Sequence, residues 1–111
     1  MKFVLLITGE DKWAELSPEE MQAGLAKYQA FAQRLRDEGR MVDAEGLDGK
    51  RVKIDADRVA SDGPFAETRE MVGGYYIYTA ADWDEAIEIA KACPSYDYGG
   101  TVELRAVLQY G

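Results

Sequence analysis

Two apolar runs in the sequence predict strands that are buried in the fold. Residues 3–8 form an unbroken apolar and β-branched run, and residues 71–79 are rich in aromatic and β-branched side chains. A run without polar alternation needs cover on both faces of its sheet. The adjacent glycines 73–74 predict a bulge or the close approach of another backbone.

The clearest helix signal begins at Ser17. Ser17 is placed as the N-cap, Pro18 as the first helical residue and Glu20 as the partner that completes a capping box, while Gly39 ends the helix. The apolar stripe at three- and four-residue steps predicts the buried side of this helix: Met21, Leu25, Tyr28, Ala32 and Leu35.

A second helix is predicted after Asp82. Asp82 is its N-cap, Glu85 stands three residues on, and Pro94 prevents its continuation. Its apolar stripe consists of Trp83, Ala86, Ile87, Ala90 and Cys93. A helix C-terminus disfavours a thiolate, so we interpret Cys93 as a core residue rather than a nucleophile.

The remaining segments predict short strands. Residues 41–44 and 52–54 alternate between apolar and polar positions, residues 55–57 resemble a hairpin turn that returns through Val59, and residues 101–107 close the chain as a strand. This order of elements predicts an α+β fold in which two helices pack on one face of an antiparallel sheet.

Such an arrangement leaves one sheet face uncovered. Val4 and Leu6 alternate with the core positions of the first strand, and tyrosines fall on both faces of residues 75–78. An apolar patch of this extent exceeds what single domains usually expose. We therefore predict a homodimer in which two sheets pack face to face.

Composition narrows the functional classes. The 111 residues predict a single domain, 1–111, and 21 acidic against 13 basic residues give a net charge of −8. This charge disfavours nucleic acid and anionic membranes as partners. Without histidine, the chain lacks the usual triads and most zinc or iron sites. With one cysteine and no apolar segment long enough to span a bilayer, we expect a cytoplasmic protein.

No metal or cofactor site is predicted. Residues 55–57 carry two aspartates, but Ala60 and Ala66 stand where a calcium loop needs glycine and glutamate. The glycine pairs 73–74 and 99–100 lack the spacing of a nucleotide-binding loop.

The most unusual string is residues 62–70. In one reading, Asp62 accepts hydrogen bonds from the turn that Gly63 and Pro64 form, as a loop cap. In the other, Asp62, Glu67 and Glu70 lie with Arg69 at a pocket mouth, where a carboxylate beside apolar walls has a raised pKa and acts as a general base. The spacing alone leaves both open.

Arg105 also has two readings. It forms an ordinary cross-strand ion pair, with Glu103, Glu45 or Asp62 as available carboxylates, or it anchors an anion in a pocket. The tyrosines are predicted mainly to pack in the sheet, although a phenol such as Tyr76 beside an arginine can orient a small polar ligand.

Residues 62–70, DGPFAETRE, resemble the signature of the YCII-related family in its DGPF branch. The resemblance to the family extends over almost the whole chain. It includes residues 17–20, 45–47, 73–76, 93–94 and 99–105. The resemblance implies a ferredoxin-like fold that forms a dimeric α/β barrel. It also implies a largely uncharacterised function, in members often encoded beside extracytoplasmic-function sigma factors.

The sequence departs from the family pattern at its suspected catalytic pair. That pair is a histidine and an aspartate, but this chain has no histidine, and Cys93-Pro94 stands where the wider family tends to have Asp-Pro. Arg69 replaces a usual lysine, and Ala106 replaces a common proline.

Two functional hypotheses follow. In the first, each subunit binds a small molecule between sheet and helices, with Asp62 as a histidine-independent acid or base and with Arg69, Arg105, Tyr76 and Glu45 as ligand-binding residues. In the second, the chain is a non-catalytic regulatory or interaction module linked to a sigma-factor system.

Overall fold

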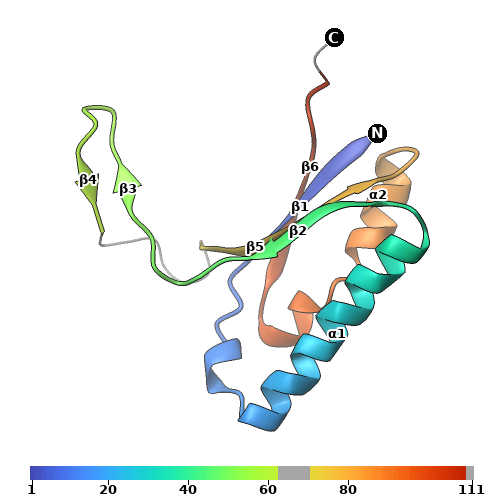
Figure 1. Cartoon of the computed structure of the whole chain (residues 1–111), viewed down its shortest axis with the longest axis horizontal. Coiled ribbons are helices and arrows are strands. Elements are labelled where there is room, and N and C mark those ends of the chain that lie inside the picture. The colour runs from blue at the N-terminus through green and yellow to red at the C-terminus, as the bar shows by residue number, and fades with distance from the viewer. Residues whose placement is uncertain (63–70, 110–111) are drawn as a thin grey trace.

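The main sheet has four strands with the order β2-β5-β1-β6, in which all neighbours are antiparallel. The computed structural model describes residues 1–62 and 71–109. The sheet comprises β1 (Lys2–Thr8), β2 (Met41–Gly46), β5 (Val72–Thr79) and β6 (Thr101–Ala106) (Figure 1). The predicted α+β, ferredoxin-like class is confirmed.

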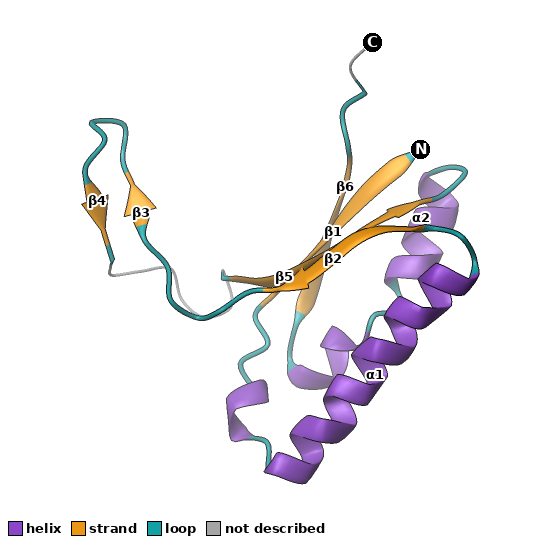
Figure 2. Ribbon diagram, viewed as in Figure 1, coloured by secondary structure: helices purple, strands orange, loops and turns teal. Residues whose placement is uncertain are grey.

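Both helices cover the same face of this sheet (Figure 2). They are α1 (Pro18–Asp37) and α2 (Trp83–Ala90), with short 3-10 turns η1 (Trp13–Glu15) and η3 (Pro94–Tyr98). The predicted capping box is present: the Glu20 amide donates to Ser17 Oγ at 3.1 Å, and the Ser17 amide donates to Glu20 Oε1 at 2.9 Å. Asp82 caps α2 by accepting from the Glu85 amide at 2.9 Å. Within the described ranges, no helix is long and apolar enough to cross a membrane.

The helix stripes are only partly as predicted. In α1, Phe31 is buried and Leu25 is 51% exposed. The reason is that the Phe31 ring packs edge-on against Tyr76 of the sheet, with 5.1 Å between the ring centroids. In α2, Ile89 is buried whereas Ile87 is exposed. Spacings of three and four residues fit more than one helical phase, and contact with the sheet selects one of them.

The core lies between the helices and the inward-facing strand positions. Phe3, Leu5 and Ile7 of β1 are buried, as are Tyr76 and Tyr78 of β5. Cys93 also belongs to this core, as predicted.

The other face of the sheet, here called the open face, carries no helix (Figures 1 and 2). Cross-strand partners place four apolar side chains at its centre: Val4 beside Ile77, and Leu6 beside Tyr75. Charged residues occupy its two edges: Asp43 and Glu45 on β2, and Glu103 and Arg105 on β6. The prediction that both faces of these strands are apolar is confirmed.

The glycine pair in β5 has both predicted roles. The pairing of β1 with β5 shifts between Ile7 and Thr8, so that Gly73 lies at a bulge. A Cβ on Gly74 would lie 3.0 Å from the backbone oxygen of Glu45 on the neighbouring strand. Glycine at 74 therefore allows β2 and β5 to approach closely.

Residues 47–62, here called the hairpin arm, project beyond the end of the main sheet (Figure 1). The strands β3 (Lys53–Ile54) and β4 (Ala60–Ser61) pair only as a separate two-stranded sheet. Asp55 Oδ1 accepts from the amides of Asp57 and Val59, both at 2.9 Å, and Arg58 has a φ of 65°. The predicted hairpin is confirmed, and its turn is built by the Asp55 side chain.

Candidate functional site

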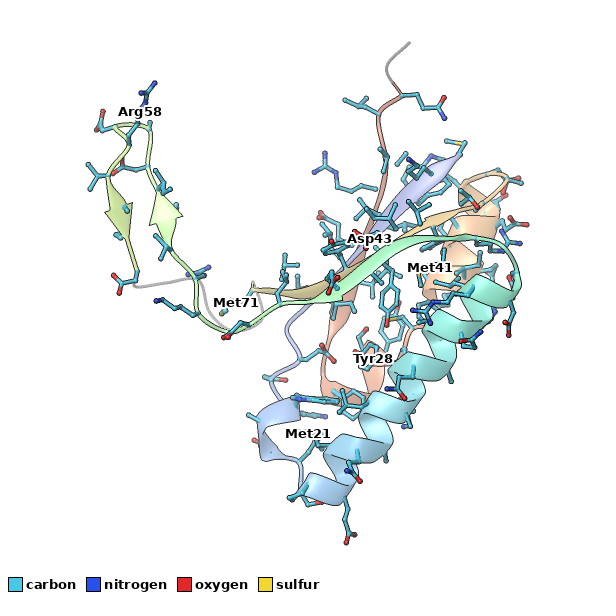
Figure 3. All side chains as sticks on the ribbon, in the orientation of Figure 1. Met21, Tyr28, Met41, Asp43, Arg58 and Met71 are labelled. Carbon is cyan, nitrogen blue, oxygen red and sulfur yellow. The ribbon has the colours of Figure 1, made fainter. Side chains whose placement is uncertain are left out.

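A cavity of about 740 Å³ lies on the helix-covered face of the sheet. The loop after β1, the first half of α1 and the adjoining ends of β2 and β5 surround it. Tyr28 projects from α1 between the helix and the sheet (Figure 3). The lining is mainly apolar, with Ile7, Trp13, Leu25, Leu47, Met71, Val72 and Tyr76 among its residues. This volume suits a small organic molecule.

The polar centre of the cavity is a carboxylate–phenol pair. The Tyr28 hydroxyl donates to Glu10 Oε2 at 2.5 Å, and both residues line the cavity. Burial raises the pKa of Glu10, and the hydrogen bond from Tyr28 offsets part of that rise. Burial and the Glu10 carboxylate raise the pKa of Tyr28, so its proton stays on the phenol. Glu10 is therefore a stronger base than an exposed carboxylate, and Tyr28 is a fixed donor.

Two glycines leave room for the groups around this pair. A Cβ on Gly24 would lie 2.7 Å from the Trp13 ring, and a Cβ on Gly100 would lie 2.9 Å from Glu10 Cγ. Trp13 packs edge-on against Tyr98 at 4.9 Å, which holds the loop after β1 against η3. The positions of Trp13 and Glu10 therefore require glycine at residues 24 and 100, where any larger side chain would collide with them.

Tyr76 closes the floor of the cavity. Its ring packs against Phe31, and burial, followed by nearby Cys93 and Glu10, raises its pKa to about 12. The Cys93 thiol also has a raised pKa because it is buried. Both groups remain protonated near neutral pH, so neither competes with Glu10 as a base.

The charged residues that line the cavity are all acidic. They are Glu10, Asp48 and Glu45, although the pairing of Glu45 with Tyr75 directs its carboxylate to the open face, and the described lining residues include no lysine or arginine. An anionic ligand would meet repulsion here, whereas a neutral ligand that donates hydrogen bonds would fit. In the described residues, no group of His, Cys, Asp or Glu is arranged to hold a metal ion.

The structure separates the residues that the sequence analysis assigned to one site. Tyr76 and Glu45 line the cavity, although the pairing of Glu45 with Tyr75 directs its side chain to the open face. Arg105 pairs with Val4 and is exposed on the open face, across the sheet from the cavity. Asp62 is exposed directly after β4 and does not line the cavity. Arg69 lies outside the described residues.

Sequence reasoning missed Glu10 and Tyr28. The sequence pattern assigns no role to Glu10, and it places Tyr28 only in the apolar stripe of the first helix. One available signal was the position of Glu10 directly after a buried strand, where loop residues often carry function. Its pairing with Tyr28 across 18 positions depends on how α1 lies on the sheet.

Comparison with known proteins gives a family and a fold. The family model described as YCII-related domain matches residues 1–110. An uncharacterized protein of Rhizobium meliloti (strain 1021) is 39% identical over 56 residues, which cover 47% of this chain and 43% of that protein. The chain thus aligns with less than half the length of this curated relative.

A solved structure resembles the whole chain. It is 5-chloro-2-hydroxyhydroquinone dehydrochlorinase from Burkholderia phenoliruptrix AC1100, in complex with 2,5-dihydroxybenzoquinone. The TM-score is 0.54 at 16% identity, with coverage of 100% of this chain and 96% of that chain. At this identity the likeness establishes the shared fold.

Proposed function

Since this chain belongs to the YCII-related family, we propose that it binds a neutral, hydroxylated or enolisable small molecule in the cavity and that Glu10 exchanges a proton with it. The observation that carries the proposal is the Glu10–Tyr28 pair, which faces a mainly apolar cavity. No reactive cofactor is required for such proton transfer.

The lining determines the class of ligand. The apolar walls favour a ring or short carbon skeleton, and the acidic lining favours a neutral molecule with hydroxyl donors. The structural neighbour was solved with a hydroxylated quinone ring, which supports a hydroxylated ring as a ligand of this size and shape.

The proposed chemistry uses two side chains. The Glu10 carboxylate removes a proton from the carbon next to a ligand carbonyl and becomes the neutral acid, while the ligand becomes an enolate. Tyr28 stays protonated and can donate to the enolate oxygen once it leaves Glu10. Return of a proton from Glu10 to carbon restores both partners, so the step is balanced without an external oxidant or reductant.

The sequence-based assignment of Asp62 as the acid or base is replaced by Glu10 in this proposal. Asp62 is exposed on the hairpin arm and does not line the cavity. Arg105 is not part of the proposed site because it lies across the sheet. Tyr76 remains a proposed ligand contact on the cavity floor.

The test is ligand binding and deuterium exchange with Glu10→Gln. We expect neutral phenols and cyclic enols to bind the wild type and to lose roughly 10- to 100-fold in affinity with Glu10→Gln, because a hydrogen bond to a charged group is worth about 1.5–3 kcal/mol. Calorimetry measures the affinity. The matched control is Asp48→Asn, which removes a lining carboxylate that is not bonded to Tyr28.

NMR then tests the proton transfer. The wild type and Asp48→Asn should incorporate solvent deuterium at the carbon next to the carbonyl of a bound cyclic ketone, and Glu10→Gln should not. Equal affinity and equal exchange in Glu10→Gln would refute the role of Glu10. Binding to the wild type without any exchange would instead favour the non-catalytic module.

The homodimer predicted from the sequence is also part of the proposal. Val4, Leu6, Tyr75 and Ile77 form an apolar centre with charged edges, which is the usual anatomy of an interface. A second copy of the chain offers the same surface, as a two-fold interface requires.

A further inference from the structure

The large aliphatic side chains of the two strands of the hairpin arm and of its turn are exposed in the described part of the chain. Every residue from Glu45 to Asp62 is exposed. Three large aliphatic side chains of the arm are more than half exposed: Val52, Ile54 and Val59. An isolated two-stranded hairpin is at best marginally stable in water, because it buries too little apolar surface.

The arm nevertheless has a specified geometry. Asp55 holds the turn through two backbone amides, and the amide of Asp55 donates to Val59 oxygen at 3.0 Å. Arg58 adopts the left-handed region, which costs energy for a residue other than glycine. A sequence that builds such a turn and leaves its aliphatic side chains in water indicates a surface made for contact.

The shape of the molecule indicates where that contact lies. The radius of gyration is 15.4 Å, whereas a compact chain of this length has about 13 Å. The arm extends away from both helices, toward the side of the sheet that they leave uncovered (Figures 1 and 2). The arm and the open face are therefore available to one partner.

The open face by itself is small for a stable interface. Four strands spaced at about 4.8 Å and some six residues long at about 3.4 Å project onto roughly 400 Å², and the relief of the side chains makes the accessible surface somewhat larger. A standard interface takes about 800 Å² from each partner. The exposed aliphatic side chains of the arm supply further area.

Charge favours a second copy as that partner. The arm holds four of the 13 basic and four of the 21 acidic residues, so it is neutral and the net charge of −8 lies elsewhere in the chain. Sheet-to-sheet contact alone brings two acidic bodies together. A neutral arm, with Lys50 just before its first strand and Lys53 in it, meets an acidic body with less repulsion.

We propose that the hairpin arm of each subunit packs against the body of a second copy, in a reciprocal exchange that accompanies contact between the open faces. The inference rests on the homodimer proposed above and is independent of the chemistry proposed for Glu10.

The first experiment measures the dimer dissociation constant by analytical ultracentrifugation. Ile54→Ser/Val59→Ser should raise it at least tenfold, because both side chains lose apolar contact with the partner. The control Ile87→Ser makes the same kind of change at an exposed position of α2 and should leave it unchanged. Leu6→Glu places charge on the open face and should abolish the dimer.

The second experiment mixes ¹⁴N- and ¹⁵N-labelled chains and cross-links their amines. We expect cross-links from Lys50 or Lys53 of one isotopic form to lysines of the other. The arm proposal would be refuted if the dimers gave only cross-links within one chain for the arm and if Ile54→Ser/Val59→Ser left the dimer dissociation constant unchanged. That result would still be compatible with a dimer through the open faces. A wild type that stays monomeric at 100 µM would overturn both.

Discussion

At the scale of single residues, the proposed function depends on a polar group, Glu10, that is partly buried beside a hydrogen-bond partner. Glu10 is a stronger base than an exposed glutamate because it is partly buried in an apolar cavity, although the hydrogen bond from Tyr28 offsets part of the rise in its pKa. Tyr78 is a buried polar side chain whose hydrogen bond stabilises the fold. Its ring is completely buried, and its hydroxyl donates to the Ala86 oxygen at 2.7 Å, which connects β5 to α2.

Tyr78→Phe should lower the free energy of unfolding by about 0.5–1.5 kcal/mol, since it removes one buried hydrogen bond without a large cavity. Urea denaturation measures the change. Tyr96→Phe is the matched control, because Tyr96 donates to another carbonyl of α2, Ala90, from a partly exposed position. We expect a smaller loss for Tyr96→Phe, and equal losses would contradict the importance of burial.

At the scale of elements, the strand ends beside the cavity depend on glycine. Gly73 and Gly74 both line the cavity, but they differ in what a side chain would meet. At Gly74 the nearest atom is the Glu45 backbone oxygen at 3.0 Å, and at Gly73 it is the Glu10 Oε1 atom at 3.8 Å. Backbone on a paired strand cannot move aside as a side chain does.

Gly74→Ala should therefore destabilise the fold by about 1–3 kcal/mol, because the added methyl forces β2 away from β5. Gly73→Ala, next to it on the same strand, should change stability by about 0.5 kcal/mol or less. Thermal unfolding of the two variants measures the difference. A Gly73→Ala variant that is as unstable as Gly74→Ala would show that the strand approach is not the cause.

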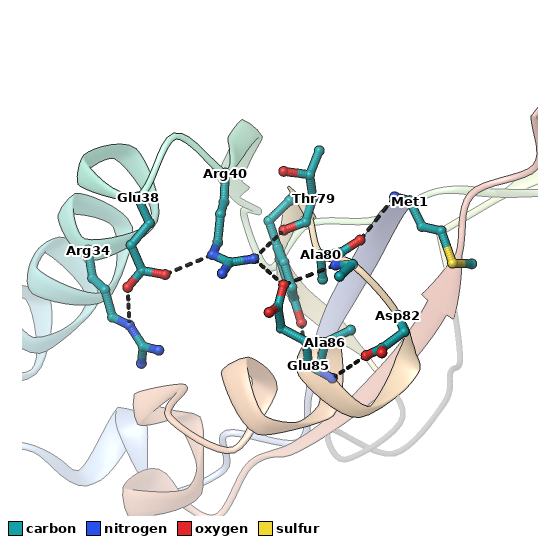
Figure 4. A network of polar contacts seen from close by, with 11 residues as sticks. Met1, Arg34, Glu38, Arg40, Thr79, Ala80, Asp82, Glu85 and Ala86 are labelled. Atoms are coloured by element: carbon teal, nitrogen blue, oxygen red, sulfur yellow. Dashed lines mark hydrogen bonds and ion pairs between the residues drawn. The ribbon is translucent and has the colours of Figure 1, made fainter.

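At the scale of the whole molecule, one arginine connects three elements (Figure 4). Arg40 Nη1 donates to Glu85 Oε1 at 2.6 Å and to the Thr79 oxygen at 3.2 Å, and Arg40 Nε donates to Glu38 Oε1 at 2.8 Å. The end of α1, the end of β5 and the start of α2 thus meet at one guanidinium. Glu85 also accepts from the Ala81 amide at 2.9 Å.

This network predicts how stability depends on pH. Hydrogen bonds from Arg40 and the Ala81 amide lower the pKa of Glu85 below its usual 4.5. A carboxyl with a lowered folded-state pKa stabilises the fold above the unfolded value and loses that contribution as the pH falls through the folded value. The difference in melting temperature between wild type and Glu85→Gln should therefore be largest at pH 7 and should shrink toward pH 3.

Circular dichroism at several pH values measures this difference. Glu88→Gln is the control, because Glu88 pairs with Lys91 at the exposed surface of the same helix. Its effect should be small at every pH. A melting-temperature difference for Glu85→Gln that is constant from pH 7 to pH 3 would exclude the charge as its origin.

The sequence by itself determined the local structure. The caps at Ser17 and Asp82, the hairpin around Asp55, the glycine bulge in β5 and the apolar open face were all predicted, and the structure confirms them. Each depends on residues that are close together in the chain or on strict alternation along one strand. Their geometry therefore follows from side-chain chemistry and backbone sterics alone.

Only the tertiary structure decided on which face of the sheet each functional candidate lies. Glu10 and Tyr28 meet because the phase of α1 on the sheet turns Tyr28 toward the loop after β1. Arg105 lies on the open face because its register places it beside Val4, and a shift of one residue would have reversed that. Burial and packing between distant segments set phase and register, and no short stretch of sequence contains those contacts.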